Sequence, residues 1–222
     1  FILFKPKDIV SGDFYWLIKY EGKEFLSAVD CTGHGVPGAF MSIIGHNSLN
    51  KIVREYGIVE PGQILTRLNQ EVIGTLHQSS YAPDVYDGMD LALVGYDPQK
   101  RILHYAGAFN PLYLVRKGEL FETKADKLSI GRSSVDTLTT FTNHTLSIEE
   151  GDTIYIFSDG YADQFGGEKM KKFKYGNLKE LLIKIQDKDM DEQKIILNNT
   201  IENWRGDIAQ VDDILIIGRR FK

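Results

Sequence analysis

The chain has 222 residues, a length that suits one large domain or two small ones. Its composition, 42% hydrophobic and 26% charged residues, is that of a globular protein, and no apolar run approaches the roughly 18 residues that span a bilayer. A net charge of -5 without a long basic run argues against a nucleic-acid groove.

The chain organisation indicates one domain. We find no low-complexity linker and no internal repeat, so we expect a single domain over residues 1–222. The chain starts at Phe1, and its opening FILF lacks a signal-peptide pattern, so we expect a domain excised from a longer protein. The single cysteine, Cys31, excludes an internal disulfide and fits a reducing compartment. We expect a cytoplasmic domain without membrane contact, and a membrane anchor elsewhere in the full-length protein is left open.

In chain order, the apolar patterns predict the following elements: strands over 12–20 and 23–30, helices over 38–56 and 61–77, strands over 89–97, 101–107, 112–116 and 152–159, helices over 177–186 and 191–204, and a strand over 213–219. The short connections between the middle strands require antiparallel pairing, because a parallel return needs a crossover of about a dozen residues. Strands grouped between helical pairs indicate an α+β fold.

The helix over 38–56 shows the 3.6-residue period of one buried face. Pro37 is expected at its first position, where the N–H that proline lacks would have no acceptor within the helix. We expect Phe40, Ile44 and Leu49 on the buried face.

Acidic residues stand at the beginnings or ends of several predicted strands: Asp13, Asp30, Asp159 and the pair Asp212-Asp213. Any one of them alone is more often a turn or cap residue. If they converge, like charges shielded from water require raised pKa values or bound cations. Without histidine or cysteine at metal-ligand spacing, an all-oxygen site for Mg²⁺ or Mn²⁺ is indicated, and two such ions are suited to hydrolysis of phosphate esters.

A competing motif lies directly after Asp30. Gly33-His34-Gly35-Val36-Pro37-Gly38 fits G-x-G-x-x-G, the turn of a dinucleotide-binding fold. That fold requires a ribose-binding acid on the next strand about 20 residues further on, but the residue at that distance, Glu55, lies on a predicted helix. We therefore reject an oxidoreductase and expect the glycines to bend the backbone beside the acids.

With these residues in place, the sequence resembles the SpoIIE/RsbU branch of the metal-dependent PP2C (PPM) serine/threonine phosphatases. The resemblance covers nearly the whole chain, and these motifs carry it in the family's order: SGDFY, VDCTGHGVPGAFMS, YDGMDLAL, YAGAFNPLYL, LSIG, TIYIFSDGYADQFGG and QVDDILIIG. It implies a four-layer α-β-β-α sandwich in which two antiparallel sheets hold two divalent cations, Mn²⁺ or Mg²⁺, at one edge.

The resemblance also implies roles for individual residues. Asp30 matches the aspartate that bridges both metals, and Cys31 would contribute its backbone carbonyl. Asp159 and Asp212 match ligands of one metal, and Asp13 matches an acid near the other. These four aspartates are the implied catalytic residues, and the implied mechanism is in-line attack of a metal-bridging hydroxide on phosphorus. Asp213 would support the ligands.

Other residues receive plainer interpretations. Thr32 stands where eukaryotic relatives have a histidine that can donate a proton, and His34 is interpreted as a loop anchor. Lys5 and Lys7 are candidates for the family's phosphate-binding arginine, although a solvated strand end is favoured. Asp87 and Asp90 are interpreted as turn and strand-start residues, with a role near the metals left open. Residues 161–167 are interpreted as a mobile flap after a metal ligand or as a surface loop, and Lys169, Lys171, Lys172 and Lys174 as a solvated loop.

The resemblance implies that the chain is the output domain of a bacterial signalling protein. Its substrate would be a phosphorylated STAS-type anti-anti-sigma protein in a partner-switching pathway, and an upstream sensor or regulatory domain would control it. A homodimer is left open. Two alternatives remain: a non-catalytic phosphoprotein-binding pseudophosphatase, and a phosphomonoesterase acting on small molecules.

Overall fold

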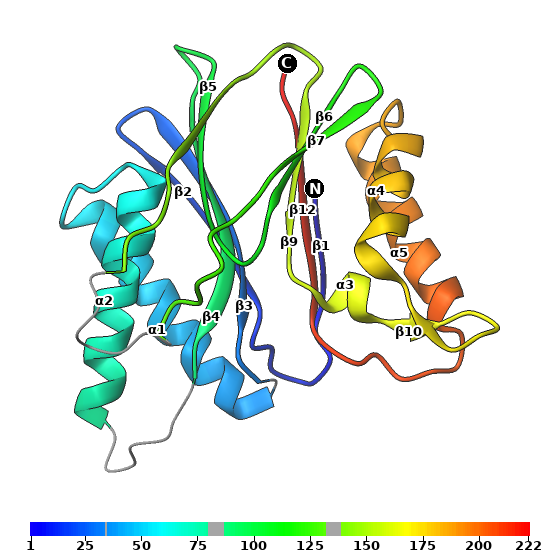
Figure 1. Ribbon diagram of the computed structural model, residues 1–222, viewed down its shortest axis with the longest axis horizontal. Helices are drawn as coiled ribbons and strands as arrows, with labels where there is room; N and C mark the ends of the chain where they lie inside the picture. Colours follow the sequence, from blue (N-terminus) through cyan, green and yellow to red (C-terminus); the bar gives the residue numbers. More distant parts are fainter. Residues whose placement is uncertain (34, 80–86, 132–138) are drawn as a thin grey trace.

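A computed structural model describes residues 1–33, 35–79, 87–131 and 139–222. Its helices and strands form four layers, with the helices α1 and α2 on one side, two antiparallel sheets in the middle, and the helices α4 and α5 on the other side (Figure 1). The predicted α+β sandwich of α-β-β-α type is confirmed.

The first sheet lies against α1 and α2 and has the strand order β2-β3-β4-β5-β8. Its strands are β2 (Phe14–Tyr20), β3 (Lys23–Cys31), β4 (Met89–Asp97), β5 (Ile102–Ala108) and β8 (His144–Ser147). The central strands β3 and β4 are buried along most of their length, as expected for strands that are covered on both faces. Their register places Asp30 opposite Asp90.

The second sheet lies against α4 and α5 and has the strand order β1-β12-β9-β6-β7. Its strands are β1 (Ile2–Lys5), β6 (Leu112–Arg116), β7 (Glu119–Thr123), β9 (Thr153–Phe157) and β12 (Ile214–Arg220). The last strand, β12, is inserted between β1 and β9, so the two ends of the chain lie side by side in the same sheet.

The helices close the outer layers. They are α1 (Gly35–Arg54), α2 (Pro61–Ser79), the short α3 (Gly160–Asp163), α4 (Lys174–Lys184) and α5 (Met190–Arg205). A two-stranded ribbon of β10 (Phe165–Gly166) and β11 (Lys171–Lys172) connects α3 to α4. Across the described ranges, none of the helices combines the length and the apolar character that a membrane-spanning segment requires.

The predicted elements are confirmed with shifted bounds, but two predictions about the first helix are wrong. Helix α1 begins at Gly35, so Pro37 is its third residue rather than its first, although it still lies in the first turn, where N–H groups have no intrahelical acceptor. Phe40 does not lie on the buried face: its side chain is 66% exposed, whereas Leu49 is fully buried.

Candidate active site

Strands β3 and β9 end, and strands β2 and β12 begin, at one edge of the sandwich, the lower edge in Figure 1. The four predicted acids stand at these strand ends. Asp13 directly precedes β2, and Asp30 is the penultimate residue of β3. Asp159 lies two residues after β9 ends, and Asp212 lies two residues before β12 begins. Four separate segments of the chain therefore each contribute one carboxyl group to what we call the acid cluster: Asp13, Asp30, Asp159 and Asp212.

Burial and mutual repulsion raise the pKa values of three of these carboxyl groups, those of Asp13, Asp30 and Asp159. Burial has the largest effect on the pKa of Asp13, and the charge of Asp30 adds to it. Burial likewise raises the pKa of Asp30 to about 8, with Asp159 as the strongest repelling charge. The pKa of Asp159 is raised to about 6 by burial and then by Asp212. The charge of Asp30 thus acts on Asp13, that of Asp159 on Asp30, and that of Asp212 on Asp159, so the four carboxyl groups are close neighbours.

The structure shows one feature of the acid cluster that suits a cation. Asp13 is almost fully buried, and within the described residues its Oδ2 atom has no hydrogen-bond partner. Although the four acids act on one another, no three histidine, cysteine, aspartate or glutamate side chains in the described ranges are already close enough together to hold a metal ion. The donors are oxygens, which are the ligands that Mg²⁺ and Mn²⁺ prefer. The residues present therefore fit hard divalent cations by their chemistry.

Asp213 supports the segment that carries Asp13. Its buried carboxylate accepts hydrogen bonds from three backbone amides, those of Lys7 at 2.7 Å, Gly12 at 2.8 Å and Asp13 at 3.2 Å. A carboxylate occupied by three N–H donors is a structural anchor. The supporting role expected for Asp213 agrees with this arrangement.

The glycines after Asp30 serve backbone packing. A Cβ atom on Gly38 would lie 2.3 Å from the carbonyl oxygen of Gly33, and one on Gly12 would lie 2.4 Å from the same oxygen. The segment before Asp13 therefore rests directly on the beginning of α1. This contact requires glycine at position 38, whereas Gly33 and Gly35 adopt positive φ angles of 82° and 68°, which favour glycine. His34 lies outside the described residues.

Cys31 ends β3 and is buried. Burial raises the pKa of its thiol well above its usual range, so the side chain is a neutral core group. Its carbonyl oxygen lies 3.4 Å from the position of a Cβ atom on Gly12. The Cys31 carbonyl is therefore close to the segment that carries Asp13, and the charge of Asp13 also acts on the thiol.

The structure adds three charged residues that sequence reasoning had treated as turn, strand-start or loop residues. Asp90 lies opposite Asp30 in the sheet, adds to the raised pKa of Asp30 and Asp159, and accepts a hydrogen bond from Ser129 at 2.5 Å. Asp163, at the end of α3, is ion-paired at 2.7 Å with Lys172, whose charge lowers the pKa of Asp159. The sequence signals for Asp90 are its place at the start of a predicted strand and its position in the motif YDGMDLAL.

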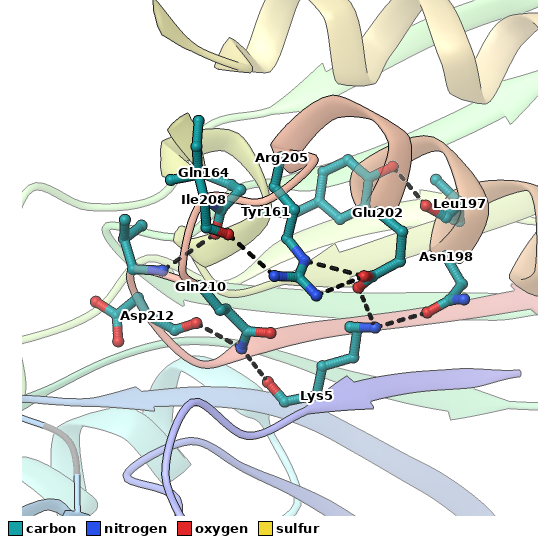
Figure 2. Close-up of polar contacts among 11 residues, drawn as sticks. Lys5, Tyr161, Gln164, Leu197, Asn198, Glu202, Arg205, Ile208, Gln210 and Asp212 are labelled. Carbon is teal, nitrogen blue, oxygen red and sulfur yellow. Dashed lines mark hydrogen bonds and ion pairs between the residues drawn. The ribbon is translucent and has the colours of Figure 1, made fainter. Parts of the chain in front are cut away.

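Lys5 is held away from a phosphate-binding role. Its Nζ atom lies 2.6 Å from Glu202 and 2.9 Å from the Asn198 side chain, both on α5 (Figure 2). Of Lys7, the structure shows the backbone amide bound to Asp213.

Comparison with known proteins identifies relatives of the chain. A family model described as stage II sporulation protein E (SpoIIE) matches residues 21–222. The phosphoserine phosphatase RsbU of Bacillus subtilis (strain 168) is 28% identical over 162 residues, which cover 71% of this chain and 44% of RsbU. The chain therefore spans less than half the length of this curated relative.

Two solved structures share the fold. The SiaA-PP2C domain of Pseudomonas aeruginosa superposes with a TM-score of 0.90 and 31% sequence identity, covering 100% of this chain and 85% of that one. The PP2C phosphatase domain of SpoIIE from Bacillus subtilis, solved with a fragment of its regulatory domain, has a TM-score of 0.76 and 18% identity, covering 99% and 62%. These similarities identify the four-layer sandwich as the PP2C fold.

Proposed function

Because the chain belongs to the SpoIIE family and is a PP2C-type phosphatase domain, we propose that it removes phosphate from phosphoserine or phosphothreonine on a signalling protein. The observation that carries this proposal is the acid cluster, in which four partly or fully buried carboxyl groups repel one another at one edge of the sandwich. Such a concentration of buried acids is unfavourable unless it serves a site.

We propose that Asp30, Asp159, Asp212, Asp13 and the carbonyl of Cys31 hold two divalent cations. Bound Mn²⁺ or Mg²⁺ would neutralise these carboxylates and make a water molecule acidic enough to attack phosphorus in line. Asp213 keeps the Asp13 segment in place through three amide hydrogen bonds. Asp90 adds a further negative charge beside Asp30 and Asp159.

Two side chains at the cluster support a direct attack by water without a covalent intermediate. The Cys31 thiol is buried, and burial raises its pKa, so it does not form a thiolate nucleophile. The Ser158 hydroxyl is buried and already engaged, because it accepts the Leu215 amide at 3.1 Å and hydrogen-bonds Asp13. Neither group is placed to take up a phosphoryl group.

We also propose the partners implied by the family. The substrate would be a phosphorylated STAS-type protein in a partner-switching pathway. An upstream regulatory domain would control the phosphatase, which would act in the cytoplasm. Two copies of the domain could form a homodimer. Membership of the SpoIIE family and the similarity to RsbU support this proposal.

The test is hydrolysis of p-nitrophenyl phosphate and of a phosphoserine peptide with Mn²⁺, with Mg²⁺ and with EDTA. We expect activity that requires the cation and falls at least a hundredfold in Asp159→Asn. The control is Asp97→Asn, because Asp97 ends β4 at the opposite edge, and its carboxylate binds the amides of Gln99 and Lys100, which asparagine can also accept. Cation binding without hydrolysis of either substrate would contradict the proposal and favour a pseudophosphatase. Hydrolysis of small phosphomonoesters without the peptide would favour a small-molecule phosphatase.

A further inference from the structure

Gln164 is a fully buried polar side chain five residues after Asp159. It follows the four-residue helix α3, and its backbone amide donates to Gly160 at 3.1 Å. Its backbone carbonyl accepts the Trp204 indole N–H at 3.1 Å and the Phe173 amide at 2.9 Å. The backbone at Gln164 is therefore fixed to both α5 and the start of α4.

The Gln164 side chain binds the segment that leads to Asp212 (Figure 2). Its Nε2 atom donates to the carbonyl of Ala209 at 3.1 Å and to that of Phe165 at 3.0 Å. Its Oε1 atom accepts the backbone amide of Val211 at 3.1 Å. One amide group thus contacts the chain on both sides of position 210, immediately before Asp212.

The segment between α5 and β12 depends on such contacts because, among the residues that the structure describes, no strand pairs with it. The Gln210 side chain donates to the carbonyls of Lys5 at 2.7 Å and Asp212 at 2.8 Å, and Arg205 donates to Ile208 at 3.0 Å (Figure 2). Gln210 and Arg205 tie the segment to β1 and α5. Gln164 ties it to the segment that carries Asp159.

We propose that Gln164 is a positioning residue that sets the spacing of Asp159 and Asp212, so that cation affinity depends on its side-chain amide. This inference rests on the proposed cation site and extends it to a residue outside the acid cluster. Gln164 does not touch the reacting groups. It acts through the backbone, because a shift at Val211 is passed directly to the next residue, Asp212.

Gln193 provides a matched control. It is also fully buried, and its Oε1 atom accepts the Tyr155 hydroxyl at 2.7 Å while its Nε2 atom donates to Lys188 at 3.1 Å and Gln186 at 3.4 Å. These contacts lie at the start of α5, the end farther from Asp212. Gln193 therefore resembles Gln164 in burial and hydrogen bonding but not in its connection to the acid cluster.

The experiment compares Gln164→Met with Gln193→Met, each titrated with Mn²⁺ by electron paramagnetic resonance. We expect both substitutions to lower the melting temperature in EDTA, because each leaves buried backbone groups unpaired. Only Gln164→Met should weaken Mn²⁺ binding, by about tenfold, as is typical when support of metal ligands is lost. Hydrogen exchange of the Val211 backbone amide, which donates to Gln164, should accelerate in Gln164→Met but not in Gln193→Met.

A second variant covers the case in which Gln164→Met fails to fold. Gln164→Glu keeps an acceptor for Val211 but places an oxygen against the carbonyls of Phe165 and Ala209, and we expect it to weaken Mn²⁺ binding as well. Equal Mn²⁺ affinity in wild type and the folded Gln164 variant would overturn the positioning role alone. No Mn²⁺ or Mg²⁺ binding by wild type would overturn the proposed function together with this inference.

Discussion

At the scale of single residues, the close approach of two segments requires glycine at position 160. A Cβ atom on Gly160 would lie 1.9 Å from the carbonyl oxygen of Asp213 and 3.4 Å from the Cβ atom of Asp212. Any larger residue must therefore push the segment after β9 away from the segment before β12. These are the two segments that carry Asp159 and Asp212.

We expect Gly160→Ala to lower Mn²⁺-dependent hydrolysis at least tenfold and to destabilise the fold by about 1–3 kcal/mol, the usual cost of overpacking. Gly74→Ala is the control. Gly74 lies inside α2, nothing lies within 4 Å of the added Cβ atom, and alanine there should stabilise the helix by about 0.5–1 kcal/mol. Urea denaturation and a steady-state assay measure both effects. Full activity in Gly160→Ala would show that the two segments tolerate separation.

Single residues also show which parts of the acid cluster the sequence predicts and which it does not. Asp13, Asp30, Asp159 and Asp212 were predicted because each stands beside a strand and matches a family motif. For Asp90 the sequence favours a strand-start residue and only leaves a role near the metals open, because its position opposite Asp30 follows from the register between β3 and β4. Register depends on side-chain packing across the sheet, which no short motif records.

At the scale of elements, the sequence predicted long apolar strands and amphipathic helices and missed the short or mixed elements. β7 (ELFET) and β8 (HTLS) are half exposed at the outer edges of the two sheets, so their sequences lack a clear alternation. α3 and the ribbon of β10 and β11 are too short for any periodicity. Gln164 escaped notice because it lies among these short elements.

Helix α5 permits a test of whether helix stability and site geometry are separable. Its first turn carries a capping box, in which Asp189 accepts the Glu192 amide at 2.7 Å and Glu192 accepts the Asp189 amide at 3.3 Å. We expect Asp189→Ala to cost about 1 kcal/mol in urea denaturation while kcat and Mn²⁺ affinity stay unchanged. Asp189→Asn, which retains a cap, is the control. A parallel loss of Mn²⁺ affinity would show that the whole of α5 is coupled to the acid cluster.

At the scale of the whole molecule, the acid cluster determines how stability responds to pH. The pKa values of Asp159 and Asp30 are raised to about 6 and about 8, whereas aspartate in an unfolded chain titrates near pH ~4. In that interval the folded chain binds more protons than the unfolded chain, so the free energy of unfolding falls as pH rises. Each additional bound proton contributes a slope of about 1.4 kcal/mol per pH unit.

We therefore expect the free energy of unfolding in EDTA to decline more steeply with pH in wild type than in Asp30→Asn, measured in urea from about pH 5 to about pH 8. Saturating Mn²⁺ should remove this excess decline, because cations bind the deprotonated carboxylates. Asp97→Asn should keep the wild-type slope. Identical slopes in wild type and Asp30→Asn would show that Asp30 is ionised in the folded chain throughout this range.

The insertion of β12 between β1 and β9 has a consequence for biosynthesis. The carboxylate of Asp213 binds amides some 200 positions earlier, and β1 pairs with residues 214–217, so the acid cluster cannot be complete before residues 212–217 leave the ribosome. Contacts of such long sequence separation form late and slowly. A nascent or truncated chain that lacks β12 is therefore expected to have an incomplete acid cluster and no cation-dependent activity.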